Sequence, residues 1–111
     1  ASMAAIIQDI ETEIETLKKI IKINPITNVK SLLAQAYLRK NDGIVNEFIK
    51  KLIDEVLFEK PKDPGANFIL AKYLNQNGNK NKSRNLLLKI LKNLDDKGPW
   101  HQIYKDELNI K

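Results

Sequence analysis

The stretch Leu70–Leu91, LAKYLNQNGNKNKSRNLLLKIL, decides how this sequence is interpreted. Two apolar segments flank a polar middle that is rich in Asn and Lys and contains one glycine, Gly78. The apolar residues in each segment recur three and four positions apart, which is typical of a helix buried on one side. Glycine readily adopts the positive φ that ends a helix in a tight turn. The stretch therefore predicts a helix, a turn and a second helix, and its lysines are expected to be exposed.

Glycines and prolines divide the rest of the chain into segments with the same helical period. Pro25 ends the first segment, because a proline disfavours helical backbone in the residue before it. Asp63 and Pro64 begin a later helix, since Asp caps free N–H groups and proline suits the first turn. No segment alternates as a β-strand does, so we expect an all-α fold of about six helices. They cover residues 3–23, 28–40, 44–58, 64–76, 80–94 and 99–110.

Each predicted helix has an apolar side that can pack against a neighbour. The stripe of the first helix consists of Ile7, Ile10, Ile14, Leu17 and Ile21. It fits packing inside the domain, and it also fits packing on a second copy of the chain in a homo-oligomeric scaffold. The predicted helices at 28–40, 44–58, 80–94 and 99–110 also have apolar sides. In that order, these contain Leu32, Leu33, Ala36 and Tyr37; Phe48, Ile49, Leu52, Ile53, Val56 and Leu57; Leu86, Leu87, Ile90, Leu91 and Leu94; and Trp100 and Tyr104.

An internal repeat relates the second helix to the fourth. Leu33-Ala34 aligns with Leu70-Ala71 at an offset of 37 residues, and a polar turn and an amphipathic helix follow each. The later unit has a fixed order of residue types: a large apolar residue, a small residue, a further apolar residue, a glycine and another small residue. This pattern resembles the tetratricopeptide repeat, a helix–turn–helix unit of about 34 residues. The residues that carry the resemblance are Leu70, Ala71, Leu74, Gly78 and Ser83.

The earlier unit departs from the family pattern at two positions. Asn41 stands where the family has glycine, and Asn46 stands where it has a small residue. The segment Ile20–Pro25 resembles the end of a preceding unit. The resemblance implies one domain, a short right-handed solenoid of stacked helix pairs. Its parts are a leading helix at 3–24, a degenerate repeat at 27–60, a clear repeat at 64–97 and a capping helix at 99–110.

The resemblance also implies a function, because tetratricopeptide arrays bind a peptide or helix of a client protein in a concave groove. The first helix of each pair forms its inner wall. The positions that face the groove correspond to Asn28, Ser31, Gln35, Arg39, Phe68, Lys72, Asn75 and Gln76. Arg39 and Lys72 could bind carboxylates of the client, and Phe68 could hold an apolar side chain.

A narrower resemblance concerns the end of the chain. The sequence Leu87–Leu91, followed by Gly98-Pro99-Trp100 and a closing helix, is similar to the tetratricopeptide domain of bacterial cytochrome c maturation factors. Those domains lie in the periplasm on membrane-anchored proteins and hold the C-terminal helix of apocytochrome c. The resemblance implies an assembly chaperone in cytochrome c biogenesis. The opening Ala1–Met3 is typical of residues added in cloning, so the sequence leaves both the periplasm and the cytoplasm open.

Side chains suited to catalysis are scarce. The chain has no cysteine and a single histidine, His101. A single histidine beside a tryptophan is more often a structural or surface residue than a base or a metal ligand. No nucleophile with a partner, phosphate-binding loop or metal-ligand cluster is present in the sequence. We therefore expect no enzymatic activity, no metal and no cofactor.

Charge is distributed unevenly. Residues 60–111 hold eleven Lys and Arg against five Asp and Glu, whereas residues 1–59 hold eight against nine. Such an excess can indicate an anionic partner, such as RNA or an anionic surface. The cations that would contact it are Lys80, Lys82, Arg84, Lys89 and Lys92. An ordinary solvated surface explains them more simply, and we do not expect nucleic acid to be the partner.

Overall fold

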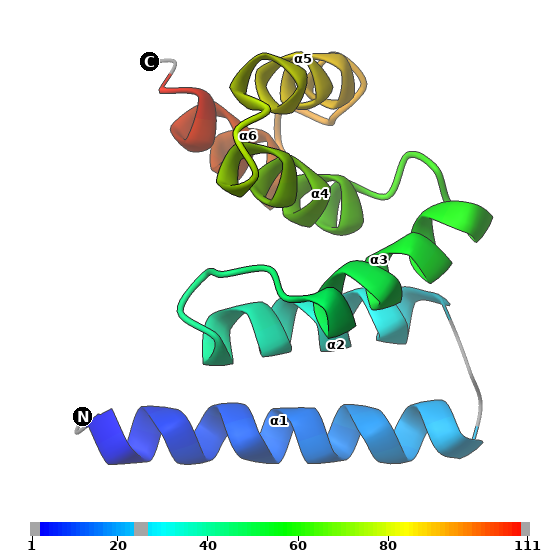
Figure 1. The fold of residues 1–111 in the computed structure, drawn as a ribbon. Helices are drawn as coiled ribbons and strands as arrows, with labels where there is room; N and C mark the ends of the chain where they lie inside the picture. Colours follow the sequence, from blue (N-terminus) through cyan, green and yellow to red (C-terminus); the bar gives the residue numbers. More distant parts are fainter. Residues whose placement is uncertain (1–2, 24–26, 110–111) are drawn as a thin grey trace.

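The structure is a computed structural model that describes residues 3–23 and 27–109, with side chains described from residue 10 onward. Over those residues the chain forms six α-helices and no β-strand, which confirms the predicted all-α fold (Figure 1). The helices are α1 (Met3–Ile23), α2 (Thr27–Lys40), α3 (Glu47–Glu59), α4 (Pro64–Gln76), α5 (Lys80–Leu91) and α6 (Pro99–Leu108).

The helices α2, α4 and α6 form a row, and α1, α3 and α5 pack beside it. α4 is at the centre of the row and contacts both α2 and α6. α1 packs on α2, α3 packs on α2 and α4, and α5 packs on α4 and α6. Figure 1 shows the helices stacked largely in chain order, from α1 at the bottom to α5 at the top. From α2 to α6, successive helices along the chain belong alternately to the row and to the helices that pack beside it.

The core consists of three buried clusters that follow these helix contacts. The central cluster, between α2, α3 and α4, contains Ala34, Leu38, Val45, Ile49, Ile53, Val56, Ala66 and Ile69. The C-terminal cluster, between α4, α5 and α6, contains Ala71, Leu87, Ile90, Tyr104 and Leu108. The N-terminal cluster, between α1 and α2, contains Ile14, Leu17, Leu33 and Ala36. Tyr37 and Leu52 pack against both the central and the N-terminal cluster, so burial is continuous from α1 to α4.

The apolar stripe of α1 packs on α2 within the chain. Its members that join or touch the N-terminal cluster are Ile10, Ile14, Leu17 and Ile21. The side chain of Ile7 lies outside the described residues. Ile20 and Ile23 are 40% and 85% exposed. Self-association through α1 stays a prediction, and among the α1 side chains that the structure describes, Ile20 and Ile23 are the large apolar ones left exposed.

Helix boundaries set by local chemistry lie where the sequence predicts them. The Asp63 carboxylate accepts a hydrogen bond of 2.8 Å from a backbone N–H in the first turn of α4, and Pro64 is the first residue of that helix. Gly78 has a φ of 86°, the left-handed conformation that glycine permits. The Asn79 N–H donates to the Leu74 carbonyl oxygen at 2.8 Å across this turn. The turn between α4 and α5 is therefore residues 77–79, at the centre of the polar middle, and the rest of that middle belongs to the ends of the two helices.

Two predicted boundaries are wrong by three residues, and the others differ from the structure by two residues or fewer. α3 begins at Glu47 rather than Ile44, because the Asn46 side chain accepts a 2.8 Å hydrogen bond from the third N–H of the helix. Asn46 is a departure from the repeat pattern, and it is also the cap of α3. α5 ends at Leu91 rather than Leu94, because the following backbone hydrogen bonds tighten to spacings of three residues.

Some apolar residues are more exposed than their spacing suggests. Leu32, predicted to face inward, is 48% exposed, and Phe48 is 54% exposed. Leu32 lies on the same side of α2 as Asn28 and Gln35, which are four residues before it and three after it. The Phe48 ring contacts the Tyr37 ring edge-on, with ring centres 5.0 Å apart. Phe48 is therefore only partly covered, although it contacts Tyr37.

Candidate functional site

Ser31 and Gln35, two of the predicted groove residues, lie where α2 meets the first turn of α4. The Ser31 hydroxyl donates to Asp63 Oδ2 at 2.9 Å and accepts from Gln35 Nε2 at 3.2 Å. A Cβ atom at Gly65 would come within 2.4 Å of Gln35 Nε2, so the glycine allows this close approach. Ser31 is 4% exposed. Ser31 therefore links α2 to the residue that caps α4, and Gln35, which bonds to Ser31 within α2, retains some exposed surface.

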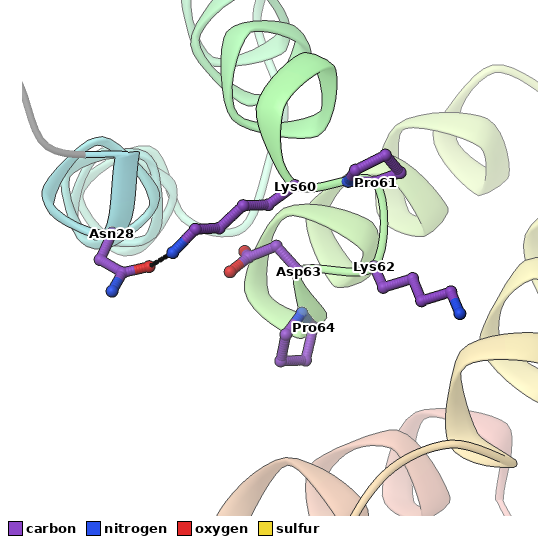
Figure 2. A pocket seen from close by; sticks show the side chains of 6 residues that line it. All are labelled: Asn28, Lys60, Pro61, Lys62, Asp63 and Pro64. Atoms are coloured by element: carbon purple, nitrogen blue, oxygen red, sulfur yellow. Dashed lines mark hydrogen bonds between the residues drawn. The ribbon is translucent and has the colours of Figure 1, made fainter.

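Asn28 and Arg39, the other predicted groove residues of α2, also contact neighbouring elements. Asn28 Oδ1 accepts a hydrogen bond from Lys60 Nζ at 2.6 Å, across an open hollow of about 470 Å³ (Figure 2). Residues 60–64 form the rest of that hollow. Arg39 Nη2 pairs with Glu13 Oε1 of α1 at 2.6 Å. Arg39 is thus directed toward α1.

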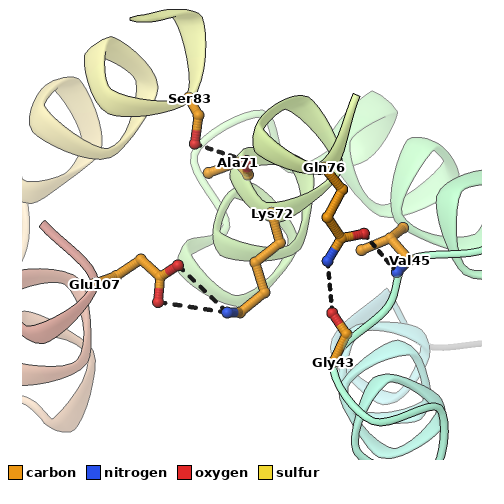
Figure 3. Close-up of polar contacts among 7 residues, drawn as sticks. All are labelled: Gly43, Val45, Ala71, Lys72, Gln76, Ser83 and Glu107. Atoms are coloured by element: carbon orange, nitrogen blue, oxygen red, sulfur yellow. Dashed lines mark hydrogen bonds and ion pairs between the residues drawn. The ribbon is translucent and has the colours of Figure 1, made fainter. Parts of the chain in front are cut away.

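Gln76 links the end of α4 to the turn between α2 and α3 (Figure 3). Its Nε2 donates to the Gly43 carbonyl oxygen at 2.7 Å, and its Oε1 accepts from the Val45 N–H at 2.9 Å. Both ends of the amide are used within the chain. Asn75, the preceding residue, is exposed on the side of α4 that faces α5 and α6.

An aromatic cluster joins α4 to α6. The Phe68 ring centre is 5.7 Å from those of Trp100 and Tyr104, and the last two are 6.2 Å apart. Tyr104 is fully buried, and its hydroxyl donates to the Pro64 carbonyl oxygen at 2.5 Å. Phe68 and Trp100 are half-buried. The cluster therefore combines one fully buried ring with two residues that are only partly buried.

Lys72 lies beside this cluster, one turn further along α4. Its Nζ is 5.0 Å from the centre of the Phe68 ring. The same Nζ is 3.3 Å from Glu107 Oε1 and 3.4 Å from Oε2, so Lys72 links α4 to α6 (Figure 3). These distances are long for a charge-assisted hydrogen bond. The ammonium group of Lys72 thus lies beside the apolar Phe68 ring, where a ligand carboxylate could bind it together with Glu107.

A smaller cavity opens beyond Lys72, between the end of α4, the first half of α5 and the end of α6. We call it the C-terminal cavity, and its volume is about 220 Å³. It is lined by Asn75, Lys80, Ser83, Arg84, Leu87, Glu107 and Leu108. Arg84 Nη1 donates to the Leu108 carbonyl oxygen at 3.5 Å, a long contact. Sequence reasoning assigned Lys80 and Arg84 only to the basic surface, because their proximity to α6 depends on tertiary packing.

Burial raises the pKa of the Tyr104 hydroxyl well above its usual value of 10.0, and the Asp63 carboxylate raises it further. Above pH 10 the unfolded chain loses this proton while the folded chain keeps it, so stability falls as pH rises. The free energy of unfolding should fall through this group by up to about 1.4 kcal/mol per pH unit. Urea denaturation between pH 9 and 11.5 should show a shallower decline for Tyr104→Phe than for the unmodified chain. Parallel declines would contradict this prediction.

The described residues contain no group of three or more His, Cys, Asp or Glu side chains placed to hold a metal ion. His101 is half-buried in the first turn of α6, next to Trp100. None of the described helices is both long enough and apolar enough to cross a membrane. The chemistry that the site offers is therefore an apolar contact at Phe68 and Trp100 with cations nearby.

Comparison with protein-family models, curated protein sequences and solved structures finds no match to this chain.

Proposed function

We propose that this chain is a non-enzymatic interaction domain that binds a peptide or helix of a client protein across α4 and α6. The observation that carries the proposal is the partial exposure of the neighbouring residues Phe68 and Trp100, with Lys72 beside them. Apolar anchor points with a few placed polar groups are typical of protein recognition sites. The two rings would contact an apolar side chain of the client, and Lys72 would bind a carboxylate. Asn75 extends the same surface along α4.

The proposal includes a tetratricopeptide-like solenoid, because stacked helix pairs of that kind form a concave side on which a peptide can bind. In that arrangement α2, α4 and α6 would be the first helices of successive pairs and would line the concave side. Ala34 and Ala71, which the repeat aligns, are 0% and 1% exposed, as close pairing of helices requires. The Ser83 hydroxyl, at another small position of the repeat, donates to the Ala71 carbonyl oxygen at 2.7 Å (Figure 3). The contacts of α4 with both α2 and α6 fit the same arrangement.

A narrower form of the proposal names the client. Pro99 and Trp100 begin α6, which closes the C-terminal cluster, in the order that the cytochrome c maturation factors show. On this resemblance the client is the C-terminal helix of apocytochrome c, and the chain is the periplasmic part of a membrane-anchored assembly factor. An amphipathic helix would present both an apolar side chain for Phe68 and a charge for Lys72.

The proposal is tested with two probes: a fluorescein-labelled C-terminal peptide of apocytochrome c, and a random dodecapeptide display library. We expect saturable binding of peptides with an apolar residue, measured by fluorescence anisotropy, and at least about tenfold weaker binding to Phe68→Ala. Phe58→Ala is the matched control, because Phe58 is 89% exposed on α3, outside the site. Circular dichroism confirms that both variants fold.

Three outcomes decide between the alternatives. Binding of library peptides without the cytochrome peptide would keep the site and remove the named client. Equal binding to both phenylalanine variants, with a steep loss of affinity at high salt, would instead indicate the basic surface of α5. No enrichment of any peptide would overturn the proposed function.

A further inference from the structure

The C-terminal cavity has the side chains of an anion site. Lys80 and Arg84 are four residues apart on α5, which places them on the same side of the helix. Both are exposed, and both line the cavity. The only hydrogen bond that the described residues give the Arg84 side chain is the long one to Leu108, so most of its five N–H donors are available. Asn75 adds an amide from α4.

The charge balance of the cavity favours an anion. Glu107 is the acidic residue among those that line it, and its carboxylate is already paired with Lys72. Among the described residues, Lys80 and Arg84 therefore leave the cavity an excess of two positive charges once Glu107 is paired with Lys72. The sequence from Lys72 to Lys92 contains no acidic residue that could neutralise the excess. A ligand carboxylate would enter a region of positive potential.

We infer that this cavity binds a carboxylate of the client, three residues after the apolar side chain that contacts Phe68; the inference rests on the function proposed above. Phe68 and Asn75 are seven residues apart on α4, a rise of about 10 Å at 1.5 Å per residue. Three residues of an extended peptide also span about 10 Å. The site therefore selects a spacing as well as two side-chain types. The carboxylate can belong to the chain terminus or to an Asp or Glu side chain.

Four synthetic peptides test the spacing and the source of the carboxylate by NMR titration of the isotope-labelled chain. Acetyl-Gly-Ser-Phe-Gly-Ser-Ala with a free carboxyl terminus should bind about tenfold more tightly than its C-terminal amide. The amidated peptide that ends in Asp instead of Ala supplies the carboxylate from a side chain. In acetyl-Gly-Ser-Gly-Ser-Phe-Ala the free terminus is too close to the ring, and we expect about tenfold weaker binding.

A matched pair of variants tests the cavity itself. Arg84→Gln and Lys89→Gln remove the same charge from the same helix, and Lys89 is exposed outside the cavity. Arg84→Gln should weaken the acid peptide about tenfold and abolish its advantage over the amide, whereas Lys89→Gln should change neither. Binding of the acid peptide should also shift the amide resonances of residues 75 and 84.

The possible failures are distinguishable. If the peptides bind and Phe68→Ala weakens them, but the acid and the amide bind equally, the carboxylate site is overturned and the proposed function stands. Equal loss in Arg84→Gln and Lys89→Gln would show a diffuse charge effect and would also overturn the site. No shift changes with any of the four peptides at millimolar concentration would overturn the proposed function and this inference with it.

Discussion

Replacing Ile53 by alanine is expected to lower the free energy of unfolding by about 2–5 kcal/mol. Ile53 is fully buried together with Ile49 and Val56, on the side of α3 that fills the central cluster. The substitution removes apolar contacts with α2 and α4, and it leaves a cavity that packed helices fill only in part. Urea denaturation followed by circular dichroism measures the change.

Phe58→Ala provides the control on the same helix. Phe58 is 89% exposed, so its truncation should change the free energy of unfolding by less than about 0.5 kcal/mol. If Ile53→Ala does not fold, Ile53→Val, with an expected cost of about 0.5–1.5 kcal/mol, keeps the comparison measurable. A similar cost for Phe58→Ala and Ile53→Ala would contradict the position of α3 in this fold.

The contrast between these residues shows what periodicity alone can predict. Ile49, Ile53 and Val56 are spaced three and four apart, and they are buried as that spacing predicts. Phe48 lies about 100° around the helix from Ile49, at the margin of that side, and it is 54% exposed. Spacing determines which residues share a side of a helix. Burial also depends on how far the neighbouring helix extends, and that is set by the whole chain.

Local chemistry made most helix ends predictable. The cap at Asp63, the proline after it and the left-handed Gly78 act within a few residues, and the structure has all three. Asn46 shows the limit of a family pattern. As a repeat position it counted as a departure, whereas its side chain caps α3 at 2.8 Å. The same residue type is a poor match for close helix packing and a good match for a helix start.

The candidate site was less predictable, because its polar contacts join distant parts of the chain. Ser31 bonds to Asp63, 32 residues away, and Gln76 bonds to Val45, 31 residues away. A sequence pattern can assign such side chains to one side of a helix without showing whether they are already used. The Lys72–Glu107 pair likewise depends on the contact between α4 and α6. The side chains that are left to contact a ligand can be identified only once these internal partners are known.

Tyr104→Ala should cost about 3–5 kcal/mol and should also abolish peptide binding, because Tyr104 holds α6 against α4. The ring is fully buried between Phe68 and Trp100, and the hydroxyl bonds to Pro64 in the first turn of α4. Its loss should expose the single tryptophan, so a red-shifted emission and faster hydrogen exchange in α6 should accompany the lower stability.

Tyr104→Phe separates the two contributions of this residue. It keeps the ring and removes the hydroxyl, so it should cost only about 0.5–1.5 kcal/mol and leave the fluorescence of Trp100 and peptide binding nearly unchanged. If Tyr104→Ala cost no more than Tyr104→Phe, the ring would not support the contact between α4 and α6. The proposed site would then lack its base, since the pairing of Phe68 with Trp100 depends on α6 staying in place.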